Sequence, residues 1–391
     1  MKNTKNIIIT FCLVTIILLA GCSSTANVAH NTKNNEAIRI GLSVPLTGPA
    51  ASWGQNALAG TTLAVKEINA KGGINDRRIQ IIAEDDKCGD ESVNVYQRLI
   101  NAYKVKAILG PVCSTAAGPA LPIVKDYNIP NVIITASAAE FTSIGDNIFR
   151  VYPSDAKQGE YAAKFIFNEF GKKKTAIIYA NNAWGKPITD KFVEEYISMG
   201  GEISYKAGIL DEEKDFKLLI AKIKETDAEV LYLPLHPTNG LMVLKQIKEA
   251  GIDIPIISGD GLAGEEILSN EYAEGILYTM AESDISETFK NKIKTIPGYK
   301  NLEVSIAATY AYDAAIVMFD ALKKSDLTSE SINANLRKTR IPGVTNSIIE
   351  FDNIGDIKNV KFQTYKIENG ESVVYNWFIL LNNIKVIKRS W

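Results

Sequence analysis

The chain has 391 residues, and its 43 basic and 45 acidic side chains leave a net charge of -2. No basic stripe is interleaved with aromatic residues, so the composition argues against a nucleic-acid partner. The body that follows the first three dozen residues is too long for one core, and we expect it to form two domains.

The first residues have the pattern of an export signal. Lys2 and Lys5 precede a run from Ile7 to Ala20 that carries no charge. This run is shorter than the roughly 20 residues that a membrane-spanning helix needs, and small residues end it. We therefore expect residues 1–21 to be a secretory signal and the protein to be exported.

Residues 19–22, Leu-Ala-Gly-Cys, resemble the lipobox of bacterial lipoproteins. In lipoproteins the signal is cut before the cysteine and the cysteine is acylated. The resemblance implies that Cys22 carries a lipid and tethers the protein to a bacterial membrane, facing the periplasm or the cell exterior. Residues 22–36 are polar and would form a flexible tether. An ordinary signal peptide with an incidental cysteine is the alternative.

From residue 38 on, short β-branched runs alternate with amphipathic helical patterns, which is typical of βαβ units on a parallel sheet. The expected strands are Ile38–Val44, Ile79–Asp85, Ala107–Gly110 and Asn131–Thr135, then Thr175–Ala180, Val230–Leu235, Ile254–Ser258 and Gly275–Tyr278. The expected helices include Ala57–Asn69, Ser92–Tyr103, Ala156–Phe170, Phe216–Lys224 and Gly240–Ala250. Two rounds of alternation predict an α/β fold with two doubly wound, Rossmann-like lobes.

Three segments fall between the two rounds and are candidate crossovers: Arg150–Ser154, Thr279–Glu282 and Ile348–Asp352. If they connect the lobes, the helical stretch Ile306–Leu322 returns to the first lobe. The N-terminal lobe would then comprise 37–152 plus 281–348, and the C-terminal lobe 153–280 plus 349–377. Residues 378–391 form a tail that is either an added edge segment or an artefact of the gene model.

Most residue patterns of enzyme active sites are missing. The two histidines, His30 and His236, have no further metal ligands at suitable spacing, and no phosphate loop or nucleophile elbow occurs. Residues 259–264 match the dinucleotide-binding pattern GxGxxG. That pattern belongs to the first βα turn of a domain, whereas this match lies late in the second lobe and places Asp260 where a pyrophosphate would lie. We expect no catalytic residues, no metal and no cofactor. A tight turn before a helix is the simpler interpretation of the glycines, and a nucleotide-dependent enzyme is the remote one.

Two cysteines remain in the exported body, because Cys12 leaves with the signal and Cys22 takes lipid. In an exported protein the pair Cys88 and Cys113 is most simply a disulfide. A thiol active site is the weaker alternative, because no histidine is near in sequence.

Several motifs of the body resemble the branched-chain amino-acid binding proteins of ABC transporters. They are IGLSVPLTGP at 40–49, AVKEINAKGGI at 64–74, DDKC at 85–88, GPVCS at 110–114 and FDNIGD at 351–356. Their order and spacing match that family from Ile38 to about Trp377. The resemblance implies a type I periplasmic binding protein, with two lobes that are joined by three crossovers and close on a ligand. It also implies a disulfide between Cys88 and Cys113 beside the site, and ABC permease subunits as partners.

A free amino acid presents a carboxylate that needs hydroxyl and backbone N–H donors, ideally at the start of a helix. Ser114 and Thr115 follow a predicted strand and precede a predicted helix; a simple N-cap is the alternative interpretation. The resemblance assigns main-chain contacts to Ser137 and Ala139. The family usually has a hydroxyl residue at the position of Ala139, so one contact is missing or is made by Ser137.

The ammonium group of the ligand needs an anion. The resemblance places Asp260 where the family has an acidic residue that pairs with the ligand amine; a solvated turn carboxylate is the alternative. Trp53 and Trp184 stand where the family has aromatic residues that cover the ligand, unless each packs within its own lobe. Leu235 replaces a frequent tyrosine and favours an apolar ligand side chain.

Together these features predict a lipid-anchored substrate-binding protein, not an enzyme, that delivers a small amino acid of the branched-chain type to an ABC importer. The same architecture serves binding proteins for urea, short amides and aromatic acids, and Ala139 and Leu235 leave that alternative open. A sensory role, in which ligand occupancy is passed to a receptor, is also open.

Overall fold

The structure is a computed structural model that describes residues 36–375, except 49, 211, 283–284 and 346–347. The predicted signal at 1–21, the acylation site Cys22 and the tail at 378–391 lie outside these residues, as does the predicted tether apart from Glu36.

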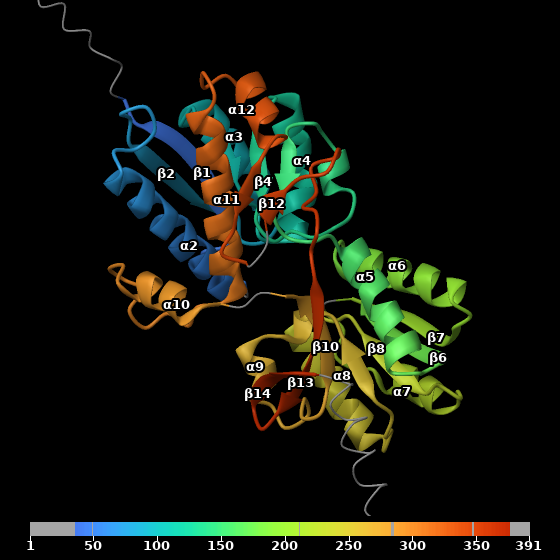
Figure 1. Cartoon of the computed structure of the whole chain (residues 1–391). Helices are drawn as coiled ribbons and strands as arrows, with labels where there is room; N and C mark the ends of the chain where they lie inside the picture. Colours follow the sequence, from blue (N-terminus) through green and yellow to red (C-terminus); the bar gives the residue numbers. More distant parts are fainter. Residues whose placement is uncertain (1–35, 49, 211, 283–284, 346–347, 376–391) are drawn as a thin grey trace, which may run out of the picture. The chain divides into compact units, whose positions relative to one another are not determined.

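The first sheet is wholly parallel (Figure 1). Its strands lie in the order β2-β1-β3-β4-β5, which is a doubly wound arrangement. The strands are β1 (Ile38–Val44), β2 (Ile79–Asp85), β3 (Ala107–Leu109), β4 (Asn131–Ile133) and β5 (Ile148–Arg150). In the register of β1 and β2, Ile38 lies opposite Ile79 and Val44 opposite Asp85.

Helices cover both faces of the first sheet. They are α2 (Ala51–Ala70), α3 (Glu91–Gln97), α4 (Ser114–Asp126), α11 (Ile306–Lys323) and α12 (Ser329–Leu336). Alternate side chains of β1, including Ile40 and Leu42, share one core with α11 and α12. The opposite face buries Ile108 and Ile133 against α3 and α4. Burial on both faces explains why β1 reads as a continuous apolar run. Helices α2 and α11 run side by side (Figure 1).

The second sheet has a parallel part with two antiparallel strands at one edge. Its order is β14-β13-β10-β9-β8-β6-β7. The strands are β6 (Lys174–Ala180), β7 (Glu202–Ile209), β8 (Val230–Leu233), β9 (Ile256–Ser258), β10 (Leu277–Ala281), β13 (Phe362–Glu368) and β14 (Glu371–Val374). The five parallel strands repeat the winding order of the first sheet, and β13 pairs with β10 in antiparallel register.

The second sheet is also covered on two faces. Its helices are α5 (Asp155–Lys164), α6 (Gly185–Ser198), α7 (Lys217–Lys224), α8 (Pro237–Glu249) and α9 (Glu265–Leu268). One face of β8 contributes Leu231 and Leu233 to a core with α7 and α8. The other face contributes Tyr232 to a core with α5 and α6. Helix α10 (Glu287–Lys294) packs on α2, and β11 (Arg340–Pro342) pairs with β12 (Ile348–Glu350).

Short irregular helices complete the described elements. Two π-helices, η1 (Arg98–Ala102) and η3 (Phe165–Glu169), continue α3 and α5, and two 3-10 turns are η2 (Phe141–Ser143) and η4 (Asp260–Leu262). The turn η4 directly follows β9 and carries the predicted site residue Asp260.

The predicted fold class is confirmed, and part of each candidate crossover belongs to a strand. Residues 279–281 belong to β10 and are hydrogen-bonded to β13, so they are strand rather than connection. Arg150 ends β5, and Ile348–Glu350 form β12. Strand β7 was not predicted: it lies at the edge of the sheet, and its exposed side lacks an apolar pattern. The proposed lobe boundaries stay a prediction.

Candidate functional site

The predicted site residues follow the carboxyl ends of parallel strands. Ser114 begins α4 just after β3, and residues 137–139 follow β4. In the second sheet, Trp184 follows β6, Leu235 follows β8 and Asp260 follows β9. Because carboxyl ends of parallel strands meet at one edge of a sheet, each sheet collects its own set of these residues where such folds bind small ligands.

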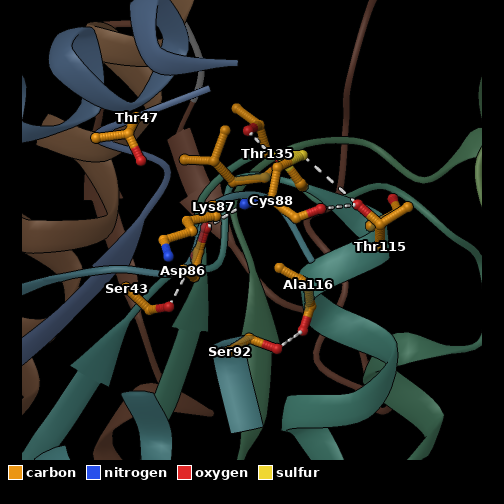
Figure 2. The surroundings of a disulfide bond; sticks show 12 residues. Ser43, Thr47, Asp86, Lys87, Cys88, Ser92, Thr115, Ala116 and Thr135 are labelled. Atoms are coloured by element: carbon orange, nitrogen blue, oxygen red, sulfur yellow. Dashed lines mark hydrogen bonds between the residues drawn. A yellow bond between two sulfur atoms is a disulfide. The ribbon is translucent and has the colours of Figure 1, made fainter. Parts of the chain in front are cut away.

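The predicted disulfide is present at the strand ends of the first sheet. Cys88 and Cys113 are bonded, with their Cα atoms 5.3 Å apart. Figure 2 shows Thr115 beside this bond, where its hydroxyl donates a hydrogen bond of 2.5 Å to the carbonyl oxygen of Cys88. The disulfide therefore joins the segment after β2 to the residue directly before α4.

Two neighbouring carboxylates, which the sequence analysis did not assign to the site, shape the same loops. Asp86 is buried and accepts hydrogen bonds from the Ser43 hydroxyl (2.8 Å) and the Cys88 N–H (2.9 Å). Burial raises the pKa of Asp86, and these two donors act against it. Asp85 accepts hydrogen bonds from the N–H of Leu46 and the hydroxyl of Thr47. The Asp-Asp pair thus holds the loops after β1 and β2.

The start of α4 is built to present backbone donors. Cys113, in extended conformation, is the N-cap residue, so Ser114 and Thr115 lie inside the first turn and the N-cap interpretation of this pair is wrong. The first N–H groups of a helix have no acceptor within it and favour an anion. The Ser114 Oγ accepts a hydrogen bond of 3.1 Å from the Ser137 N–H, so these two predicted residues are brought together. Ala139, two residues after Ser137 in the sequence, is half-buried.

Trp184 packs within the second sheet's own core. It is 8% exposed, and its ring stacks on His236 with the ring centroids 4.7 Å apart. Leu235 is fully buried in the same core. Trp53 lies in the first turn of α2, half-buried, and packs against the first sheet's core. Whether either tryptophan covers a ligand stays a prediction.

The GxGxxG pattern forms a tight turn. A side chain at Gly261 would place its Cβ 2.5 Å from the Leu235 carbonyl oxygen and 2.7 Å from the Trp184 ring, so only glycine fits. The turn Asp260–Leu262 is a 3-10 turn, and the following α9 has four residues. Gly261 therefore allows the turn to pack closely against Leu235 and Trp184.

Asp260 is not a solvated turn carboxylate. Its Oδ2 accepts a hydrogen bond of 2.5 Å from the Tyr152 hydroxyl, whereas its Oδ1 is buried and has no hydrogen-bond partner. Burial raises the pKa of Asp260, and Tyr152, Gln158 and His236 act against that effect. A half-satisfied carboxylate in such a place favours a cation as its missing partner.

Two further polar groups lie near Asp260, and sequence reasoning missed both. Asp155, the first residue of α5, is fully buried, and neither of its carboxylate oxygens has a hydrogen-bond partner. Burial, followed by the negative charge of Asp260, raises the pKa of Asp155 well above its usual range. Tyr232 on β8 is fully buried with an unpartnered hydroxyl, and burial and the charges of Asp260 and Asp155 raise its pKa. An acidic residue is common in the first turn of any helix, so the position of Asp155 did not by itself indicate a binding site.

Two absences hold for the part of the chain that the structure describes. No group of three or more His, Cys, Asp or Glu side chains is placed to hold a metal ion there. Within the same residues, no helix combines the length and the apolar character that crossing a bilayer requires.

Comparison with known proteins identifies the class. The family model of the periplasmic binding proteins matches residues 37–361. The Leu-, Ile-, Val-, Thr- and Ala-binding protein of Pseudomonas aeruginosa is 30% identical over 357 residues, which cover 89% of this chain and 94% of that protein. The Leu/Ile/Val-binding protein of Escherichia coli is 29% identical over 89% of this chain and 95% of its own length. The chain belongs to the periplasmic binding protein family.

Solved structures agree. The branched-chain amino acid transporter substrate binding protein of Streptococcus pneumoniae, in complex with isoleucine, has a TM-score of 0.77 and 27% identity, covering 87% of this chain and 99% of that one. The leucine binding protein of Thermotoga maritima has a TM-score of 0.79 over 87% of this chain and 98% of that one, and at 22% identity it shows the fold. Members of this family are solute-binding proteins of ABC transporters rather than enzymes, and they work outside the cytoplasm.

Proposed function

We propose that this protein captures a branched-chain amino acid outside the cytoplasm and delivers it to the permease of an ABC importer. Relatives that bind leucine, isoleucine and valine support this ligand class. Binding, not catalysis, is the mechanism: the ligand bridges the two sets of strand ends and shifts the population toward a closed form, which the permease subunits read.

The observation that carries the proposal is the state of Asp260. Its Oδ1 is buried without a partner while its Oδ2 is held by Tyr152. A ligand ammonium satisfies this oxygen and compensates its charge, whereas an amide or urea supplies only a neutral N–H. Asp260 therefore favours a free amino acid over those alternatives.

The ligand carboxylate would bind at the start of α4. The N–H groups of Ser114 and Thr115 lie in the first helical turn, where the helix dipole favours an anion. The main chain at Ser137 and Ala139 would supply further contacts to the ligand. Trp53 and Trp184 would cover the ligand, and Leu235 would line the floor below its apolar side chain.

A thermal-shift panel tests the function. We expect leucine, isoleucine or valine to raise the melting temperature, because a ligand at 100 times its Kd stabilises a protein by about 2.7 kcal/mol. Acetamide, urea, benzoate and NAD serve as the competing classes. Stabilisation by one of these, with no response to any amino acid, would refute the proposal.

We also propose that Cys22 is acylated and that the polar segment 22–36 tethers the protein to the membrane. The resemblance of residues 19–22 to a lipobox supports this. Cys22→Ser should move the protein from the membrane fraction to the soluble exported fraction in cells. Retention of the variant in the membrane fraction would contradict the anchor.

A further inference from the structure

Asp155, which is fully buried, lies near the half-buried Asp260, and the proposed amino-acid site does not yet explain Asp155. Both residues belong to the second sheet's layer, Asp155 at the start of α5 and Asp260 in the turn after β9. Three of their four carboxylate oxygens are buried without a hydrogen-bond partner, and so is the nearby Tyr232 hydroxyl. Buried polar groups are normally hydrogen-bonded, so this concentration of unpartnered oxygens points to a missing positive group.

The charged groups around the pair leave it short of positive charge. Arg150 on β5 lies close enough to affect Asp155, but its guanidinium forms a salt bridge to Asp356 at 2.6 Å and donates to the Ala138 carbonyl oxygen. Glu140, after β4, adds negative charge near Asp155. The charge of Arg150 lowers the pKa of Asp155, but burial and the negative charges of Asp260 and Glu140 outweigh it.

The remaining neighbours are mostly neutral. Tyr152 holds Asp260, and Tyr232 and Tyr310 approach it from β8 and α11, all as protonated phenols whose pKa values burial raises further. His236 lies near Asp260 and is the other group in this surrounding that can carry positive charge.

The two acids are not equivalent. Burial and the negative charge of Asp260 raise the pKa of Asp155 well above its usual range, although Ser137 and Arg150 act against them. Burial also raises the pKa of Asp260, and there Tyr152, Gln158 and His236 act against it. Two carboxyls that are buried together share a proton, because ionising both costs more than ionising one.

We propose that Asp155 is a second determinant of ammonium recognition: it holds a proton beside Asp260 in the ligand-free protein and releases that proton to solvent when a ligand ammonium binds. The charge balance is simple, since one cation enters and one proton leaves. A ligand without a cationic group leaves the proton in place. Asp155 acts through Asp260, which pairs with the ligand ammonium, so Asp155 is a positioning residue and does not itself need to contact the ligand. This inference rests on the proposed function for the choice of ligand.

Calorimetry of leucine binding tests the proposal. Titrations at matched pH in phosphate and in Tris, which differ in ionisation enthalpy, measure protons released per ligand. We expect release of up to about one proton by the wild type, with affinity rising by up to about tenfold per pH unit where the pair titrates. The analogue 2-hydroxy-4-methylpentanoate, which lacks the ammonium, should release none.

Variants separate electrostatics from structure. Asp155→Asn should bind leucine more weakly at pH 8 and should lose both the proton release and the pH slope. A merely structural defect would weaken binding by the same factor at every pH. Asp313→Asn is a matched control, because Asp313 is also a buried acid, but it lies on α11 and its carboxylate accepts hydrogen bonds from Val344 and Thr345. It should keep the wild-type proton release.

Several results would overturn the proposal. These are no proton release by the wild type, release that survives in Asp155→Asn, or release that disappears only in His236→Gln. If Asp155→Asn does not fold, release that persists in His236→Gln supports the proposal and loss of release there overturns it. If leucine does not bind, the titration uses isoleucine or valine. If no branched-chain amino acid binds, it uses another amino acid that raises the melting temperature, and then only the proposed function has failed. If no ammonium compound binds, both fail.

Discussion

The polar groups at the strand ends of the two sheets differ in whether they have hydrogen-bond partners. At the first sheet the polar groups satisfy one another: Ser114 accepts from Ser137, Thr115 donates to Cys88, and the disulfide fixes the start of α4. At the second sheet the acids lack partners, since Asp155 and one oxygen of Asp260 are buried without a hydrogen bond.

This difference shows which half of a zwitterion each side is suited to bind. The first side is already ordered and offers backbone donors to an anion, so little must change when a carboxylate arrives. The second side contains uncompensated negative charge and is stabilised by an arriving cation. We therefore expect ligand affinity to depend more on the second side and folding stability more on the first.

The largest effect should follow from removing the charge at the second side. Asp260→Asn should weaken leucine binding by about 2–5 kcal/mol, roughly 30-fold or more, because an amide cannot neutralise a desolvated ammonium. Isothermal titration calorimetry measures this loss. Asp126→Asn, at the exposed end of α4, is the control and should bind like the wild type. An Asp260→Asn variant with unchanged affinity would remove this residue from the site.

Breaking the covalent link at the first side should affect folding instead. The double variant Cys88→Ala/Cys113→Ala opens a loop whose ends are 25 residues apart. In the chain-entropy account this costs about 3 kcal/mol of unfolding free energy. Urea unfolding of both proteins gives the difference. A loss below about 1 kcal/mol would mean that the hydrogen bonds of Asp85 and Asp86 hold these loops without the bond.

Asp313 shows what a buried acid does when it has donors. Burial raises its pKa to about 6, against the hydrogen bonds from Val344 and Thr345. Because this folded pKa exceeds the unfolded value, the acid's contribution to stability is complete below about pH 4 and is lost as pH rises to about 6, a change of about 2–3 kcal/mol. Unfolding free energies of the wild type and Asp313→Asn from pH 4 to 7 should differ by an amount that changes accordingly. A constant difference would contradict this.

The smallest effect should come from one hydrogen bond at the first side. Ser114→Ala leaves the buried Ser137 N–H without its acceptor and should cost about 1–3 kcal/mol of stability. Thr115→Val is the matched comparison, because the Thr115 hydroxyl is in an exposed contact and its loss should cost less. Equal costs in urea unfolding would show that burial does not distinguish the two hydroxyls.

Much of the fold was predictable from apolar patterning. Strands Ile38–Val44 and Ile79–Asp85 were predicted with the bounds that the structure has, because they are short β-branched runs between clear turn signals. The edge strands β7 and β14 and the neighbouring β13 were missed, because strands with half-exposed faces lack such runs. Residues 279–281 were misassigned as a crossover because antiparallel pairing with β13 extends β10 beyond its apolar run.

The candidate site was predictable only where a residue type suits a position by itself. Ser114, Asp260 and the cysteine pair stand directly after strands or match a familiar pattern, so the sequence could nominate them. Asp155 could not be nominated, because an acid at the first position of a helix looks the same whether it faces solvent or a second acid.

The sequence by itself therefore determined the α/β class, the two rounds of winding and the residues that follow the strands, because those properties are local and periodic. Only the tertiary structure decided which of those residues have hydrogen-bond partners and which do not. Satisfaction depends on burial and on partners far along the chain, such as Tyr152 and Asp260, which are 108 residues apart and share a hydrogen bond. Whether a carboxylate lacks a partner therefore depends on the packing of the whole molecule, and in this protein the lack of partners distinguishes Asp155 and Asp260.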